Sequence, residues 1–269
     1  MSTRGGAETL VDTHCHLVLL AERGLLDRAL EGAAAAGVAQ IVSVGLNVDD
    51  SLANMRIAEA HDNVWFSVGW HPHQSSAPDP VEVHALDELL AHPRAVAVGE
   101  IGLDLFFRPG YHETPLEEQQ RALHTMYELA ATHRKPVIVH DRDAHDEVLD
   151  AIRAHPEVLG VMHCFSGDAA FARDCVASGY VVSLSGIVTF PRSEPQQEAA
   201  AQVSSADYVV ETDAPFLAPV PFRGRPNLPE YVAATASAVA RLRSVDDAVV
   251  RAETTANARR LFALPDPSA

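Results

Sequence analysis

Short hydrophobic runs alternate along the whole chain with longer stretches rich in alanine, leucine and glutamate. The short runs are rich in valine and isoleucine and nearly continuous in hydrophobicity, which is typical of parallel strands buried on both faces. We expect eight strands, at residues 10–17, 40–46, 64–71, 95–103, 136–141, 159–165, 180–188 and 208–213. The longer stretches predict helices at residues 25–36, 50–60, 83–91, 116–132, 145–154, 169–178, 194–204, 230–243 and 245–262.

The regular alternation of strands and helices indicates βα units with right-handed crossovers. Eight such units predict an α/β protein with a single (β/α)8 TIM barrel over residues 10–264. A doubly wound parallel sheet is the alternative, but the eight units are nearly equal and no glycine-rich turn follows the first strand. No linker or repeat divides the chain, so we expect one domain, with a disordered N-terminus at residues 1–9 and a frayed tail at 265–269.

The composition excludes several classes of protein. Lysine and arginine total 20 against 37 aspartates and glutamates, a formal charge of −17, which argues against a basic nucleic-acid-coating protein and against binding to anionic lipid. The charge does not exclude an anionic substrate that metal ions hold locally. No segment resembles a membrane span or the apolar core of a signal peptide, so we expect a cytoplasmic protein with no membrane contact and no obligatory protein partner. The three cysteines form no Cys-x-x-Cys pair and indicate reduced thiols.

Polar residues gather where the predicted strands end, which is the edge that carries the active site in a TIM barrel. The first strand ends in Asp12-Thr-His14-Cys-His16. Because side chains alternate along a strand, His14 and His16 point to one side and Cys15 points to the other, into the core. Asp12 is a candidate for orienting a metal-bound histidine.

Four more candidate ligands each close a separate strand: Glu100, His140, His163 and Asp213. Together with the His-x-His pair they are too many for one tetrahedral ion and enough for two, provided that a carboxylate bridges. Imidazole-rich sites suit Zn, Mn, Co or Ni, although carboxylates and waters also admit Mg. Asp104 either orients a ligand or caps a turn. The remaining histidines fall in predicted helices and loops, where we expect solvated faces: His61, His84, His92, His112, His124, His133, His145 and His155.

Candidate phosphate contacts follow the same strand ends. Arginine forks suit phosphate oxygens, and the candidates are His71, His73, Arg142, Arg223 and Arg225. Trp70 either stacks on a base or packs in the core. Ser166 lies beside His163, but no Gly-x-Ser-x-Gly elbow surrounds it, which excludes a serine hydrolase.

In order along the chain, these motifs resemble the TatD family of metal-dependent hydrolases. The matching pieces are Asp12-x-His14-x-His16, the run from Gly69 to His73, Gly99-Glu100-x-Gly102-x-Asp104, His140-x-Arg142, His163-x-Phe165-Ser166-Gly167, the run from Glu211 to Pro215, and the segment from Arg223 to Val232. One departure is Met126, which stands where family members often carry a second glutamine seven residues beyond Gln119.

The resemblance implies an amidohydrolase-type barrel with a binuclear site. His14, His16 and Asp213 would hold one ion, His140 and His163 would hold the second, and Glu100 would bridge them. The family is similar in activity to DNA phosphodiesterases, often 3′–5′ exonucleases activated by Mg. We therefore expect two divalent ions per chain (Mg, Mn or Zn) and a single-stranded DNA or other phosphodiester substrate.

The chemistry leads to the same residues, because phosphodiester hydrolysis needs an in-line nucleophile and stabilisation of charge on the phosphoryl oxygens. Asp213 is the best candidate to accept the proton of the attacking water, with Glu100 beside it. The alternative is a small-molecule amidohydrolase, lactonase or phosphotriesterase, which often bridges its metals with a carbamylated lysine. The single lysine, Lys135, precedes the fifth strand and belongs at the wrong end of the barrel. A metal-storing protein without turnover would have lost the base or a ligand, and both are present.

Overall fold

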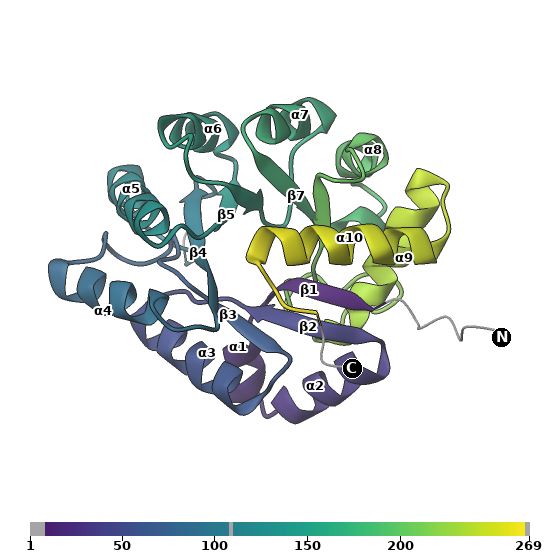
Figure 1. Ribbon diagram of the computed structural model, residues 1–269. Helices are drawn as coiled ribbons and strands as arrows, with labels where there is room; N and C mark the ends of the chain where they lie inside the picture. Colours follow the sequence, from purple (N-terminus) through teal and green to yellow (C-terminus); the bar gives the residue numbers. More distant parts are fainter. Residues whose placement is uncertain (1–8, 108–109, 267–269) are drawn as a thin grey trace.

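The computed structural model describes residues 9–107 and 110–266 and confirms the (β/α)8 barrel (Figure 1). Eight strands pair in parallel in the order in which they occur along the chain. The strands are β1 (Leu10–Cys15), β2 (Val38–Ser43), β3 (Val64–Val68), β4 (Ala95–Asp104), β5 (Val137–Arg142), β6 (Gly160–Met162), β7 (Tyr180–Leu184) and β8 (Tyr208–Val210).

Helices follow the strands along the chain, and all but the last form an outer ring around the barrel (Figure 1). They are α1 (Leu17–Glu22), α2 (Leu26–Ala35), α3 (Val48–Ala60), α4 (Pro80–Leu90), α5 (Leu116–His133), α6 (His145–Ala154), α7 (Ala169–Ala177), α8 (Glu194–Gln202), α9 (Val232–Arg243) and α10 (Asp247–Phe262). Two 3₁₀ turns, η1 (Gly186–Thr189) and η2 (Pro229–Tyr231), follow β7 and β8.

The first and last strands close the barrel just beyond the end of β8. The amide of Asp213 donates to the carbonyl of His14 at 2.9 Å, and the amide of His16 donates to the carbonyl of Ala214 at 2.8 Å. Below them, the buried carboxylate of Asp12 accepts hydrogen bonds from the amide and the hydroxyl of Thr212, at 2.9 and 2.6 Å. The histidines at the end of β1 and the acidic residues after β8 are therefore held side by side.

Helix α10 blocks the opposite end of the barrel. Valines and other aliphatic side chains that point into the barrel form one cluster with Ala258 and Phe262 of this helix. Polar contacts fix the helix in place, because Asn257 donates to the carbonyls of Ser205 and Tyr208, both at 2.8 Å. This end of the barrel is thus filled by apolar side chains, whereas the polar residues lie at the carboxyl ends of the strands.

The strands β1, β2, β3, β6, β7 and β8 end earlier than the sequence predicts. Beyond β6 and β8 the backbone takes positive φ values, 45° at Cys164 and 58° at Asp213, which do not continue a strand. The short helix α1 lies where the end of the first strand was expected, and no helix was predicted there.

Hydrogen bonds hold both ends of the described chain to the rest of the protein. Residues 1–8 and 267–269 of the predicted disordered ends lie outside the described residues. The carbonyl of Thr9 accepts a hydrogen bond from Thr255 at 2.7 Å, and the carbonyl of Pro265 accepts one from Gln40 at 3.0 Å. Within the described ranges, no helix has the length and apolarity that crossing a membrane requires.

Candidate metal centre

A cavity of about 680 Å³ opens at the carboxyl ends of the strands. Its walls carry residues from strand ends all around the barrel, as the sequence predicts. They include His16, His71, His73, Glu100, Tyr111, His140, Arg142, His163, Asp213 and Phe216.

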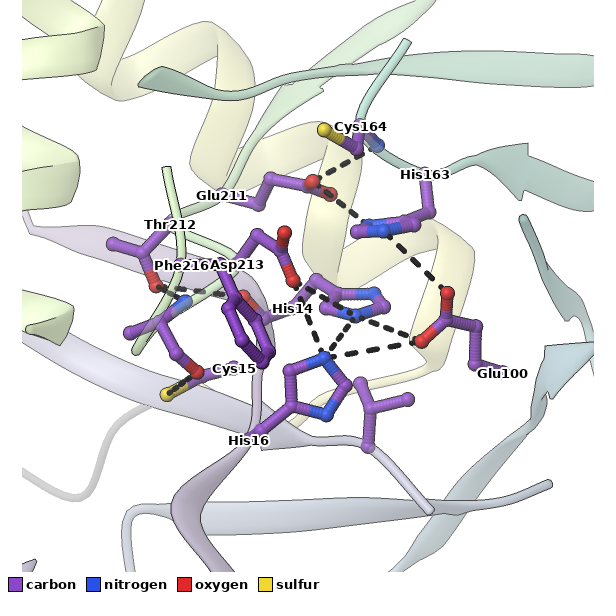
Figure 2. A network of polar contacts seen from close by, with 12 residues as sticks. His14, Cys15, His16, Glu100, His163, Cys164, Glu211, Thr212, Asp213 and Phe216 are labelled. Atoms are coloured by element: carbon purple, nitrogen blue, oxygen red, sulfur yellow. Dashed lines mark hydrogen bonds and ion pairs between the residues drawn. The ribbon is translucent and has the colours of Figure 1, made fainter. Parts of the chain in front are cut away.

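His14, His16 and Asp213 form one group of polar atoms on the cavity floor (Figure 2). The Nε2 atoms of His14 and His16 lie 3.3 Å apart, and Asp213 Oδ1 lies 3.2 Å from His16 Nε2 and 3.8 Å from His14 Nε2. Two ligands of one tetrahedral ion with bonds of about 2.1 Å would lie about 3.4 Å apart. The spacing of these three side chains thus fits a divalent cation.

A second group consists of Glu100, His140 and His163. The two carboxylate oxygens of Glu100 face different partners. Oε1 lies 2.7 Å from His140 Nδ1 and 3.6 Å from His163 Nε2, whereas Oε2 lies 3.5 Å from His14 Nε2. Glu100 therefore stands between the two groups, one oxygen towards each, the position that a bridging carboxylate requires. Figure 2 shows it facing His163 and His16.

The negative charges of the buried carboxylates favour the binding of cations at this site. Glu100, Glu211 and Asp213 are all buried, and among the described residues only histidines lie within ion-pair distance of them. Burial lowers the pKa of His163, but the charges of Glu211 and Glu100 outweigh it and raise that pKa to about 10. Burial also opposes ionisation of Glu100, yet the histidines around it hold its pKa well below the ordinary value. The buried carboxylates thus attract positive charge, which divalent ions would supply in place of protons.

Local backbone geometry places these side chains. On β5, β6 and β8 the alternation of side chains puts His140, His163 and Glu211 on the same faces as Ile138, Val161 and Val209, which point into the barrel. At Gly69 the backbone passes so close to the amide of Glu100 and the carbonyl of Gly45 that a Cβ atom would collide with both. A glycine there lets the loop after β3 lie directly against Glu100.

Glu211 contacts the centre although the sequence did not single it out as a site residue. Its Oε1 lies 2.8 Å from His163 Nδ1 and accepts a hydrogen bond from the amide of Cys164 at 2.9 Å, and its Oε2 accepts one from the hydroxyl of Ser183. The signal was present, because Glu211 and Asp213 are two residues apart and alternation places them on one side. Asp12 accepts hydrogen bonds from Thr212 and from the backbone amide of His14, so it ties the first and last strands together, and among the described residues it forms no hydrogen bond with an imidazole ring.

The residues predicted to bind substrate separate into two sets. His71 Nε2 lies 3.4 Å from Glu100 Oε1, within reach of the metal centre itself. His73 Nε2 lies 2.8 Å from Asp104 Oδ2. Arg142 lies on the cavity wall, where it donates to the hydroxyl of Tyr111 at 2.7 Å and stacks over the ring of Phe106 at 3.8 Å.

The second set lies away from this cavity. Arg223 stacks over Phe190 at 4.0 Å and lines a neighbouring hollow, while Arg225 is exposed and does not line the metal cavity.

Trp70 is buried and donates to the carbonyl of Ser76 at 2.9 Å, so it packs in the core. Cys15 is also fully buried in the core, as predicted.

One histidine prediction is wrong. His112 was expected on a solvated face, but it is only 8% exposed and its ring stacks on that of His73 at 4.3 Å. The sequence places it in a loop after β4, and nothing in that loop's pattern shows that it folds back over the strand end. Asp104 accepts a hydrogen bond from the amide of Phe106 at 2.9 Å, as a residue that caps a turn does. It also contacts His140 and His73, and its role in orienting a ligand stays a prediction.

Lys135 does not reach the cavity. Its Nζ donates to the carbonyl of Ala95, at the start of β4, whereas Glu100 lies further along the same strand. It is the single lysine of the chain, so no carbamylated lysine can bridge metals at this centre. Ser166 is exposed and its hydroxyl donates to the carbonyl of Asp141 at 3.3 Å, which leaves it without a general base.

Comparison with known proteins gives consistent results. Residues 11–263 match the family model for TatD related DNase. A protein from Mycobacterium tuberculosis described as the uncharacterized metal-dependent hydrolase TatD is 38% identical over 261 residues, covering 95% of this chain and 98% of that protein. The 3′-5′ ssDNA/RNA exonuclease TatD of Klebsiella pneumoniae is 33% identical over 245 residues, covering 88% and 92%. The crystal structure of the Escherichia coli TatD homologue YjjV superposes with a TM-score of 0.88 at 31% identity, over 95% of this chain and 98% of that one.

Proposed function

The chain belongs to the TatD family of metal-dependent hydrolases, and from that premise we propose that it is a 3′–5′ exonuclease on single-stranded DNA that uses two divalent ions, Mg, Mn or Zn. The observation that carries the proposal is the placement of Glu100. Its two oxygens face two separate groups of histidines, with Oε2 3.5 Å from His14 and Oε1 2.7 Å from His140. A single-ion site would not need a buried carboxylate between two sets of ligands.

Each residue of the site has a separate role in this proposal. His14, His16 and Asp213 would hold one ion, His140 and His163 the other, and Glu100 both. Ions so held would act as Lewis acids on the phosphoryl oxygens and lower the pKa of a water. Asp213 would take up the proton of the attacking water, because its Oδ1 lies 3.2 Å from His16 Nε2 and the residue lines the cavity. Arg142, held by Tyr111, contacts the phosphate.

The rim of the cavity suits a single strand. Tyr111 and Phe216 are 42% and 46% exposed although both line the cavity, so their rings are available for stacking on bases. No sequence readout is needed for such contacts. The charge of −17 disfavours a long track of backbone contacts, which agrees with transient binding at a strand end. The Klebsiella relative, named as an exonuclease on ssDNA and RNA, supports this class of substrate.

The test is hydrolysis of 5′-labelled single-stranded DNA by metal-stripped protein that is resupplied with Mg²⁺, Mn²⁺ or Zn²⁺. We expect progressive shortening from the 3′ end that depends on the metal and disappears in Glu100→Gln and Asp213→Asn. Glu253→Gln is the matched control, because Glu253 is a carboxylate on α10 that binds the Tyr208 hydroxyl. No cleavage by metal-loaded protein would refute the nuclease assignment, and shortening from the 5′ end would refute the polarity.

A further inference from the structure

A hollow of about 360 Å³ lies beside the metal cavity and has no part in the chemistry proposed above. It is formed by η1 and the turn after it, by α8 and by the loop after β8, and its lining includes Ile187, Phe190, Pro191, Arg192, Gln196 and Arg223. We propose that this hollow, which we call the arginine hollow, binds the phosphodiester backbone on the 5′ side of the scissile bond. The inference rests on the proposed function and adds a strand-binding subsite to it.

The arginine hollow borders the metal cavity. Ile187 lines both of them. The side-chain amide of Gln196 donates to the carbonyls of Ser166 and Gly167, and Ser166 also lines the metal cavity. A 3′–5′ exonuclease holds the scissile phosphate at its metals, so the rest of the strand must leave the cavity on the 5′ side. A strand that leaves past Ile187 and Ser166 reaches the hollow directly.

The charge of the hollow is opposite to that of the whole protein. The chain has 37 acidic residues against 20 basic ones, yet the charged side chains that line the hollow are two arginines, Arg192 and Arg223. Both residues are exposed, and within the described chain neither forms a salt bridge with a carboxylate. Two guanidinium groups without acidic partners favour the binding of phosphate groups at this place.

The side chain of Arg223 is held in position with donors to spare. Its guanidinium stacks over the ring of Phe190 at 4.0 Å, and its Nη1 donates to the carbonyl of Ala218 at 3.3 Å. Stacking occupies a face of the planar group, so the other N–H donors in its plane can still contact phosphate oxygens. The hydroxyl of Thr189 accepts the amide of Val220 at 2.9 Å, which fastens the loop of Arg223 to η1. The hollow is therefore formed before any ligand binds.

A purely structural role does not account for the whole hollow. The contacts with Phe190 and Ala218 explain Arg223, but Arg192 forms no hydrogen bond or salt bridge within the described chain. The apolar side chains of Ile187 and Phe190 also line the hollow. A nucleic-acid strand presents both phosphates and the apolar faces of sugars and bases, so it matches this combination of walls.

The first experiment measures how salt affects binding, independently of hydrolysis. The probe is octathymidylate with a 5′ fluorophore and a 3′-terminal phosphorothioate linkage that slows cleavage, and its anisotropy is followed with the metal-loaded full chain. We expect the slope of log Kd against log salt to fall by about 0.7 in Arg192→Gln and in Arg223→Gln, because each removes one phosphate contact from a single strand. Arg153→Gln is the matched control, because it removes the same charge from an exposed site on α6 and should keep the wild-type slope.

The second experiment compares kcat/KM for dithymidylate and octathymidylate. Dithymidylate carries only the scissile phosphate, so it cannot occupy the metals and the hollow together. We expect the preference for octathymidylate over dithymidylate to fall about two- to fivefold in Arg192→Gln, as for loss of one exposed charge contact, and to persist in Arg153→Gln. Circular dichroism verifies folding, and Arg192 makes no polar contact within the described chain whose loss could disturb packing.

The outcomes separate the subsite from the nuclease assignment. Salt slopes and length preferences like those of the wild type in both hollow variants would overturn the proposal, as would failure of the wild type to bind octathymidylate. Reduced slopes without hydrolysis of either substrate would refute the proposed function and leave the arginine hollow as a site that binds a single strand.

Discussion

Replacing Glu211 with glutamine should weaken metal binding without unfolding the barrel. The side chain keeps its size, and an amide oxygen can still accept the amide hydrogen of Cys164, now 2.9 Å from the carboxylate. The amide nitrogen can face Ser183, whose hydroxyl can accept as well as donate. The variant therefore removes a charge and little else.

The size of the expected loss in metal affinity follows from the contact between Glu211 and His163. Glu211 Oε1 lies 2.8 Å from His163 Nδ1, on the side of the ring opposite the nitrogen that faces Glu100. A carboxylate in that position fixes the ring and makes it a more basic ligand, and loss of such a partner typically reduces metal affinity 10–100-fold. We expect the Kd for Zn²⁺ to rise by this factor, which corresponds to about 1.4–2.7 kcal/mol.

The assay is competition for Zn²⁺ between metal-stripped protein and a chromophoric chelator, with far-ultraviolet circular dichroism to verify folding. Hydrolysis should fall at limiting metal and recover as metal is added, because the glutamate acts through a ligand. Glu253→Gln, which alters a carboxylate bound to Tyr208, should bind zinc like the wild type. Unchanged zinc affinity in a folded Glu211→Gln variant would show that the glutamate does not support His163.

One further substitution tests a buried hydrogen bond, a second tests a contact that depends on protonation, and a third tests the alternative of a lysine-bridged metal centre. Gln119→Leu should lower the free energy of unfolding by at least about 1–3 kcal/mol in urea titrations, because Gln119 accepts the amide of Asp104 at 2.8 Å and the variant leaves that buried donor unpaired. The hydrogen bond from His145 Nδ1 to Asp141 raises the pKa of His145. Its stabilisation is therefore full below about pH 6.5 and disappears as the pH rises through the folded pKa, so His145→Asn should destabilise at pH 5.5 by less than about 1 kcal/mol and not at pH 9. Lys135→Met should leave metal content unchanged, because the lysine binds Ala95 outside the cavity.

Controls and contrary outcomes differ among the three. For Gln119→Leu the control is Gln202→Leu, since Gln202 is exposed and contacts only Glu198 among the bonds described; equal losses in both would mean that burial is not the cause. A His145→Asn effect of the same size at both pH values would contradict a protonation-dependent contact. Loss of metal from Lys135→Met would revive a lysine-bridged centre.

The hydrophobic periodicity of the sequence was enough to predict the barrel. Parallel strands buried on both faces appear as continuous apolar runs, and amphipathic helices appear as apolar residues at helical spacing. The strand pattern also placed His14, His16, Glu100, His140, His163 and Asp213 at one end of the barrel. Five of them line the cavity, and the buried His14 lies beside His16 and Asp213. Their role as ligands remains a prediction. The sequence indicated them because each lies within or just after the carboxyl-terminal half of a strand whose inward face is fixed by the residues before it.

Tertiary structure decided what lies beyond the strands. Loop residues have no such period, so the sequence could not show that His112 folds back onto His73 and Asp104, or that Arg225 lies outside the cavity. The partner of His163 depends on how β6 and β8 face one another across the barrel, which sets Glu211 within 2.8 Å. A linear pattern specifies which side of a strand a residue occupies, but distances between strands that are not neighbours exist only once the barrel has closed.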